Sequence, residues 1–156
     1  MTRVTIVSQS AAQTARLAQK LSRLVLPGSV LALSGELGAG KTTFVQGFAK
    51  GLAIKQSVKS PTFVFLHVYQ GGRYLLYHFD LYRVEKADDL NQIGFSDYIH
   101  EPGAVAVVEW AEKAGAALPA DFIKIVIQMT GQNKRRLTLS GTGLQSDKIL
   151  KQFTSK

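Results

Sequence analysis

With 156 residues, of which 46% are hydrophobic and 19% charged, the chain has the size and composition of a single domain with a substantial core, spanning residues 1–156. It contains no cysteine, which excludes disulfides, thiolate metal sites and cysteine nucleophiles. No apolar run reaches the roughly 18 residues that span a bilayer, and residues 1–7 are too short and alternating for a signal peptide, so we expect a cytoplasmic protein with no membrane partner. The net charge of +8 is spread along the chain, with one tight basic cluster at residues 134–136; a solvated basic surface and an acidic or RNA-containing partner both account for it.

The N-terminal part of the chain predicts a strand followed by a helix. Residues 4–7 alternate between apolar and polar and suit an edge strand. Ser10 and Gln13 have the spacing of a capping box, in which Ser10 bonds the third helical N–H and Gln13 reaches back to the N–H of Ser10. The apolar residues that follow lie on one face of a helix of about four turns, which we expect to pack on a sheet and to end at residues 27–28: Leu17, Leu21, Leu24 and Val25.

Residues 35–42 fit the phosphate-binding pattern G-x-x-x-x-G-K-[ST] at every fixed position. An apolar run at residues 30–33 precedes this loop as a strand buried on both faces, and residues 43–51 follow it with helical spacing. In such a loop the glycines let successive N–H groups point at the phosphates, Lys41 reaches the β- and γ-phosphates, and the Thr42 hydroxyl ligates Mg²⁺. The chain is therefore expected to bind a nucleoside triphosphate through Gly35, Glu36, Leu37, Gly38, Ala39, Gly40, Lys41, Thr42 and Thr43.

Residues 60–63, which read Ser-Pro-Thr-Phe, predict a shaped turn because Pro61 fixes its own φ and biases Ser60 away from helix. Two interpretations of this turn stay open, a plain entry into a strand and a loop that senses the γ-phosphate. Residues 63–69 and 74–79 are two β-rich runs joined across a Gly-Gly pair, which predicts a hairpin.

Two carboxylates follow predicted strands. Asp80 stands where a P-loop protein places its second metal-site residue; a helix cap or a turn former is the alternative, and we favour the metal role. Glu109 follows the apolar run at residues 104–108, a central strand, and ligands of open α/β sheets bind beyond the carboxyl ends of strands, so we expect Glu109 to hold Mg²⁺ or orient the attacking water. Lys41, Asp80 and Glu109 are the candidate catalytic residues, and Thr42, Asp80 and Glu109 the candidate metal ligands. His78 could be a catalytic base, but we expect a satisfied structural histidine.

The remaining segments complete an α/β pattern. Residues 84–100 predict a short helix, a break at Gly94 and a helical turn. Residues 122–129 and 135–139 predict a second hairpin, and residues 144–156 a small amphipathic tail that is frayed. The predicted fold is a P-loop NTPase-like three-layer α/β sandwich, with a mixed, mostly parallel sheet and central and C-terminal hairpins.

Four motifs in this order resemble one family: the phosphate loop, residues 60–63, residues 78–83 (His-Phe-Asp-Leu-Tyr-Arg) and the pair Glu109-Trp110. The resemblance is to the bacterial tRNA threonylcarbamoyladenosine biosynthesis ATPase, TsaE (also called YjeE), and it runs from Ser10 to Leu139. It implies a small ATPase that uses ATP and Mg²⁺ and works with the TsaB–TsaD heterodimer, which transfers a threonylcarbamoyl group to adenosine 37 of tRNAs that read ANN codons. It also implies that the nucleotide cycle resets this complex for further turnovers. Whether tRNA contacts this chain directly or only through the partners stays open.

The resemblance also implies roles for single residues. Residues 60–63 resemble the family's first switch, and Glu109 with Trp110 its second, which adds Trp110 to the nucleotide site. Thr14 matches a threonine near the family's nucleotide pocket. Arg135 and Arg136 both qualify as the arginine that the family has near its last hairpin, and we take Arg135 as the candidate for the nucleotide site. Glu36 stands where the family often has Asp. The roles of Lys41, Thr42 and Asp80 agree with those derived above.

Two other classes compete with a regulatory ATPase. A small-molecule or nucleotide kinase of the P-loop class needs an acceptor pocket and an arginine-rich lid, and residues 134–136 are only one short cluster. A GTPase needs a guanine-reading Asn-Lys-x-Asp, and residues 133–136 read Asn-Lys-Arg-Arg without the Asp, so we prefer ATP. Because no self-supplied arginine finger is evident, we expect slow hydrolysis alone and stimulation by partners.

Overall fold

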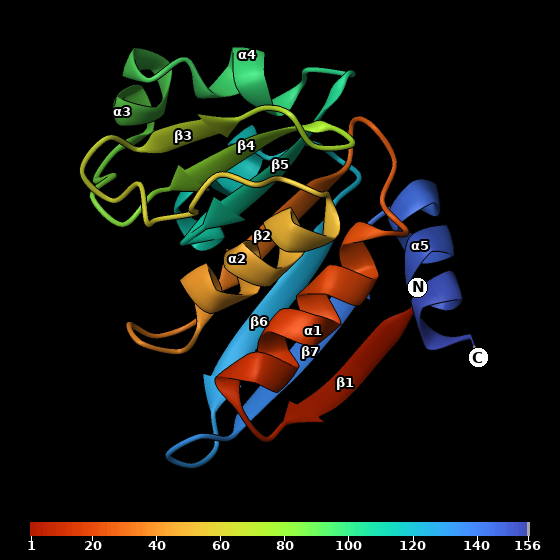
Figure 1. Ribbon diagram of the computed structural model, residues 1–156. Helices are drawn as coiled ribbons and strands as arrows, with labels where there is room; N and C mark the ends of the chain where they lie inside the picture. Colours follow the sequence, from red (N-terminus) through yellow and green to blue (C-terminus); the bar gives the residue numbers. More distant parts are fainter. Residues whose placement is uncertain (156) are drawn as a thin grey trace.

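A seven-stranded mixed sheet forms the middle of the computed structural model, which describes residues 1–155 (Figure 1). The strand order is β1-β7-β6-β2-β5-β4-β3. Neighbours within β6-β2-β5-β4 are parallel, whereas β1, β7 and β3 pair antiparallel. This confirms the predicted fold class, with its parallel core and both hairpins. The strands are β1 (Arg3–Ser8), β2 (Val30–Ser34), β3 (Leu66–Tyr69), β4 (Leu75–Asp80), β5 (Ala104–Glu109), β6 (Ile123–Met129) and β7 (Arg135–Gly141).

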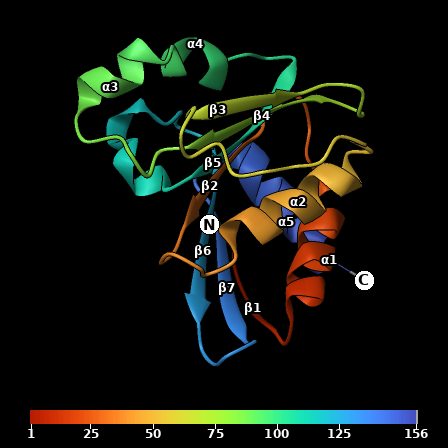
Figure 2. The same ribbon diagram turned by 60° about the vertical axis from the view of Figure 1, so that its left-hand side comes forward.

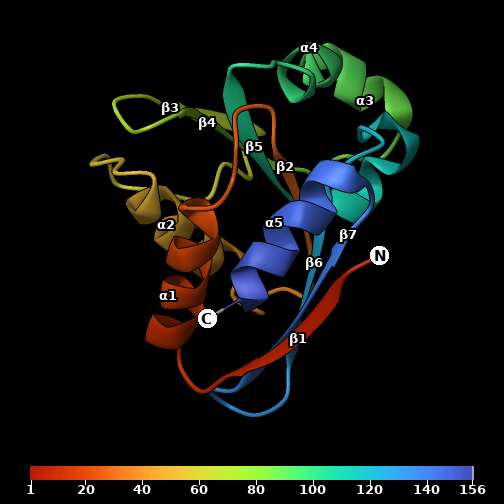
Figure 3. The same ribbon diagram turned by 90° about the vertical axis from the view of Figure 1, so that its right-hand side faces the viewer.

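Helices cover both faces of this sheet. One face carries α1 (Ala11–Ser22), α2 (Lys41–Gly51) and α5 (Leu144–Thr154), and the other carries α3 (Ala87–Gln92), α4 (Phe95–Ile99) and the short 3-10 turns Ala111–Lys113 and Gly115–Ala117 (Figures 2 and 3). Because successive side chains of a strand point to opposite faces, β5 supplies Val105 and Val107 to the first core and Val108 to the second. A strand between two helical layers is therefore apolar throughout.

The start of α1 agrees with the sequence in part. The backbone N–H of Gln13 donates to Ser10 Oγ at 3.1 Å, which confirms Ser10 as the N-cap. The Gln13 side chain accepts from the N–H of Gln9 at 2.7 Å, one residue earlier than the capping box predicts. The helix has 12 residues, about three turns rather than four, because the chain leaves the helix at Arg23.

The segment before β3 is a turn, so the prediction of a strand from residue 63 is wrong. The N–H groups of Val64 and Phe65 both donate to the carbonyl oxygen of Pro61, at 3.0 and 2.6 Å. Phe65 has φ +68°, a left-handed conformation that interrupts an extended chain. Pairing with β4 begins at Leu66, which lies opposite Phe79. Residues 60–65 therefore form a compact loop at the sheet edge.

Residues 144–154 form an ordered helix, so the prediction of a frayed tail is wrong for them; residue 156, which that prediction included, lies outside the described residues. Ile149, Leu150 and Phe153 of α5 are buried in the core that α1 and α2 share. The Asp121 carboxylate accepts from the N–H groups of Gln145 and Ser146 at 2.9 and 3.2 Å, satisfying two free donors at the helix start. Long-range contacts, rather than local propensity, stabilise this helix.

Two further findings complete the description. Gly94 separates α3 from α4 with φ +71°, as predicted. In the part of the chain that the structure describes, no helix is long and apolar enough to cross a membrane.

Candidate nucleotide site

The candidate site lies at the carboxyl ends of three adjacent parallel strands. The loop of residues 35–40 follows β2, Asp80 ends β4 and Glu109 ends β5, and the last two lie directly opposite each other. Together with α2 they enclose a cleft of about 330 Å³. The position agrees with the rule that open α/β sheets bind ligands beyond their carboxyl ends. The cleft is lined by Leu37, Gly38, Gly40, Lys41, Thr42, Thr43, Ser60, Thr62, Asp80, Tyr82, Glu109 and Trp110.

The backbone of the loop requires glycine at two places. Gly40 has φ +106° and directly precedes α2, so the loop enters the helix through a left-handed residue. Gly35 packs so closely on β6 that a Cβ would lie 2.5 Å from the carbonyl oxygen of Ile127. The 11-residue helix α2 then directs its free N–H groups and the positive end of its dipole at the loop. This arrangement favours an anion there.

Lys41 is held inside the loop. Its Nζ donates to the carbonyl oxygens of Gly35 and Glu36 at 2.5 and 3.0 Å, and it lies 4.2 Å from the centre of the Trp110 ring. Burial lowers the pKa of the Lys41 ammonium, while the negative charge of Glu109 opposes that shift. A phosphate in the loop would offer this ammonium stronger, charge-assisted hydrogen bonds than two carbonyls do.

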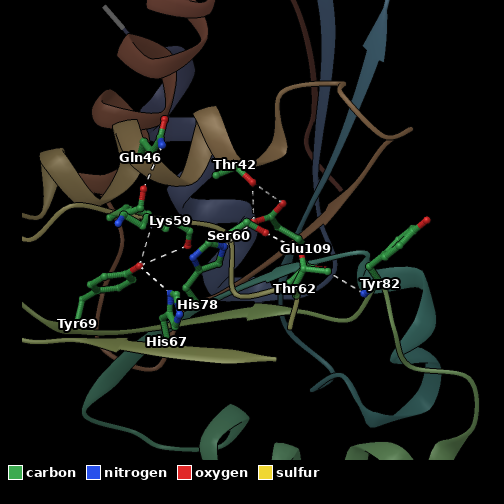
Figure 4. A network of polar contacts seen from close by, with 12 residues as sticks. Thr42, Gln46, Lys59, Ser60, Thr62, His67, Tyr69, His78, Tyr82 and Glu109 are labelled. Carbon is green, nitrogen blue, oxygen red and sulfur yellow. Dashed lines mark hydrogen bonds and ion pairs between the residues drawn. The ribbon is translucent and has the colours of Figure 1, made fainter. Parts of the chain in front are cut away.

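Glu109 is buried and connects α2 with β4 (Figure 4). Thr42 Oγ1 donates to both carboxylate oxygens, at 3.1 Å to Oε1 and 3.2 Å to Oε2. His78 Nε2 lies 2.5 Å from Oε2. The sequence predicted a satisfied structural histidine, and this is wrong in part, because within residues 1–155 the buried Nδ1 of His78 has no hydrogen-bond partner.

Asp80 holds the loop of residues 60–65. Ser60 Oγ and Thr62 Oγ1 donate to its Oδ2 at 3.1 and 2.7 Å, and the N–H of Tyr82 donates to its Oδ1 at 2.9 Å. The predicted turn and the predicted metal-site carboxylate are therefore in direct contact. Sequence reasoning missed this contact, and Tyr82 as a cleft residue.

The oxygen atoms of Thr42, Asp80 and Glu109 fit Mg²⁺. They provide one hydroxyl and two carboxylates, and Mg²⁺ in nucleotide sites takes one or two protein carboxylates while phosphates and water fill its other positions. Residues 1–155 contain no cluster of three or more His, Asp or Glu that would form an all-protein metal cage. These side chains would hold the ion only together with a phosphate ligand.

A second, smaller cavity of about 120 Å³ adjoins the other side of the loop. Thr14 lies in its wall, with Oγ1 2.7 Å from Ser8 Oγ. Arg135 Nε donates to the carbonyl oxygen of Ala39 at 2.8 Å, and its Nη2 to that of Gly38 at 3.3 Å. Arg136 is exposed on β7, so of the two candidate arginines the structure brings Arg135 to the loop. The cavity is lined by Ala11, Thr14, Gly38, Gly40, Thr43, Asn133 and Arg135.

Trp110 takes a strained backbone conformation at the end of β5. Its φ of +57° is unusual for a bulky residue and costs roughly 1–3 kcal/mol, so the surrounding contacts must compensate. Its ring lies 5.0 Å from that of Tyr82, centre to centre, and covers Lys41. Glu36 and Leu37 are exposed at the tip of the loop.

The sheet, its helical layers and the glycine loop define a protein with a P-loop NTPase-like fold. The family model for the threonylcarbamoyl adenosine biosynthesis protein TsaE matches residues 8–137, and the chain belongs to this family. It is 39% identical over 142 residues to the TsaE protein of Bacillus subtilis (strain 168), covering 91% of this chain and 88% of that one. It is 41% identical over 134 residues to the TsaE protein of Treponema pallidum (strain Nichols), covering 86% and 98%. The crystal structure of Bacillus subtilis YdiB superimposes with a TM-score of 0.84 at 33% identity, covering 98% of this chain and 95% of that one.

Proposed function

We propose that the protein hydrolyses ATP with Mg²⁺ and thereby resets the TsaB–TsaD complex during threonylcarbamoylation of adenosine 37 in tRNAs that read ANN codons. Membership of the TsaE family supports the place in tRNA threonylcarbamoyladenosine biosynthesis. One observation supports the proposed hydrolytic activity: Lys41, Asp80 and Glu109 line the same cleft at the carboxyl ends of the strands.

The proposed roles follow from the geometry. Lys41 exchanges its two carbonyl contacts for the β- and γ-phosphates, and Thr42 and Asp80 contribute oxygens to the Mg²⁺ shell, Asp80 directly or through a water. Glu109 lies against Thr42 and orients the attacking water or completes the metal shell. These charges act in a buried site, where their interactions with phosphate are stronger than in bulk water.

The nucleoside is proposed to extend from the loop toward the smaller cavity, where Thr14 and Arg135 lie. This assignment is supported by the shared walls of the two cavities, Gly38, Gly40 and Thr43. Asn133 lines the same cavity, but the Asp that would read guanine is absent from residues 133–136, which supports ATP. We place the protein in the cytoplasm.

Hydrolysis by the protein alone is proposed to be slow. Among residues 1–155 no arginine lines the cleft, and Arg135 binds the outer carbonyls of the loop instead. A partner that supplies positive charge to the γ-phosphate would therefore accelerate the reaction. The TsaB–TsaD pair is the proposed partner.

The first test measures nucleotide binding by the Lys41→Ala variant. Binding is followed by the fluorescence of Trp110, the only tryptophan of the chain. Loss of the phosphate contact is expected to weaken ATP binding at least tenfold, whereas Lys50→Ala, an exposed position of the same helix, should bind like the parent. Unchanged ATP affinity in Lys41→Ala would exclude this site.

The second test separates chemistry from binding and identifies the partner. Glu109→Ala is expected to slow hydrolysis more than it weakens ATP binding. Equal losses in both would mean that Glu109 contributes to binding only and not to the chemical step. A pull-down from cell extract with ATP or ADP should recover the TsaB–TsaD pair in a nucleotide-dependent way. Rapid phosphorylation of a small molecule without any partner would instead favour a kinase.

A further inference from the structure

We propose that His78 is a positioning residue that fixes the orientation of the Glu109 carboxylate. This inference rests on the proposed ATP hydrolysis. His78 is fully buried in β4, and its Nε2 lies 2.5 Å from Glu109 Oε2. A carboxylate oxygen only accepts, so Nε2 carries the proton and donates.

The contact with His78 distinguishes the two oxygens of Glu109. Thr42 Oγ1 is almost equally far from both, at 3.1 and 3.2 Å, and so does not select a rotation of the carboxylate group. The terminal torsion of a glutamate is broad and has little preference of its own. His78 contacts Oε2 alone and thereby fixes the plane in which the carboxylate group lies.

The imidazole is itself held in place. The Tyr69 ring stacks on it at 6.5 Å between centres, and Figure 4 shows His78 between Tyr69 and Glu109. The Tyr69 hydroxyl accepts from the N–H of Lys59 at 3.2 Å and lies 3.1 Å from His67 Nδ1. An imidazole that is fully buried and packed beside the anchored Tyr69 ring has little room to follow the carboxylate if it rotates.

Packing alone does not explain a histidine at this position. Its neighbours on the same face of β4 are Leu76 and Asp80, and the residues opposite it are Val107 on β5 and His67 on β3. Leu76 and Val107 are fully buried and apolar. Nδ1 is buried without a partner in the described chain, a cost that a leucine would avoid. The hydrogen bond from Nε2 to Glu109 therefore explains why a histidine occupies this position.

The experiment compares His78→Leu, which removes the donor, with His78→Gln, whose amide nitrogen has a reach similar to that of Nε2. His100→Gln, an exposed histidine at the end of α4, is the matched control. For the full chain, ATP hydrolysis, its Mg²⁺ dependence, metal-free ATP binding by Trp110 fluorescence and thermal stability are measured. Binding of Mn²⁺ to the ATP complex is measured separately by electron paramagnetic resonance.

His78→Leu is expected to lower kcat and weaken Mn²⁺ binding by about 10–100-fold, the usual effect of removing a residue that orients a metal ligand. ATP affinity without metal should stay within about twofold, since the loop itself is unchanged. His78→Gln should recover most of the loss, and His100→Gln should match the parent.

The proposal is overturned if His78→Leu behaves like the parent, if Gln and Leu are equally impaired, or if metal-free ATP binding falls in step with kcat. Should His78→Leu not fold, His78→Met takes its place as the variant that lacks the donor, and the same comparison with His78→Gln decides. If the parent itself does not hydrolyse ATP, the proposed function fails, while the Mn²⁺ titration of the variants still tests His78.

Discussion

The crossing of α1 and α2 gives a sharp test of the packing, because two effects of one substitution oppose each other there. Gly47 lies on α2 against α1, and a Cβ at this position would lie 2.2 Å from the carbonyl oxygen of Ala15 and 2.6 Å from its Cα. Replacing glycine by alanine inside a helix gains about 1 kcal/mol. Overpacking usually costs about 1–3 kcal/mol, and here the atoms that must move are backbone on both sides. We expect Gly47→Ala to destabilise the fold by about 1–2 kcal/mol.

Thermal and urea unfolding measure this prediction. For a chain of this size, the loss corresponds to a Tm lowered by roughly 2–8 °C. Lys50→Ala, exposed on the same helix, is the control and should change stability by less than about 0.5 kcal/mol. A Gly47→Ala variant that melts at or above the temperature of the parent would show that helix propensity prevails and that α1 and α2 separate without cost.

Three further substitutions test other parts of the molecule. Phe153→Ala should destabilise by about 3–5 kcal/mol in urea unfolding, because its ring is buried under α5. The N–H of Thr2 holds the pKa of the Asp147 carboxyl below its usual 3.8. The stability that this hydrogen bond contributes is therefore complete above pH 3.8 and is lost as the pH falls through the lower, folded-state pKa. Asp147→Asn should therefore flatten the acid limb of the stability profile. Arg135→Ala should weaken ATP binding in a fluorescence titration, whereas Arg136→Ala should not.

Features that depend on local pattern were predictable. The glycine loop, the buried strand before it and the helix after it follow from residues that are neighbours in sequence. The positions of Asp80 and Glu109 followed from strand ends, and the parallel register places them opposite each other. The alternation rule could also have shown that His78 lies on the same strand face as Asp80.

Features that depend on long-range contacts were not predictable. The pattern of Ile149 and Phe153 is amphipathic, but neighbouring residues do not indicate what their apolar side chains pack against. In the structure they complete the core on the face of the sheet that α1 and α2 cover. The contacts of Asp80 with Ser60 and Thr62 join residues 20 and 18 positions apart. No periodicity identifies such a pair, because it depends on where the loop before β3 folds back onto the sheet.

The two carboxylates of the cleft hold different parts of the molecule, and this difference bears on the proposed cycle. Glu109 contacts the partly buried Thr42 and the fully buried His78, whereas Asp80 binds the loop of residues 60–65, in which Phe63 is 82% exposed. A metal ion that takes oxygens of Asp80 competes directly with the Ser60 and Thr62 hydroxyls. A metal ion that replaces the hydroxyls on Asp80 would therefore act on residues 60–63 of the surface loop. One that replaces the contacts of Glu109 would act on groups inside the fold. Of the two carboxylates, Asp80 is therefore the one in direct contact with the loop of residues 60–65.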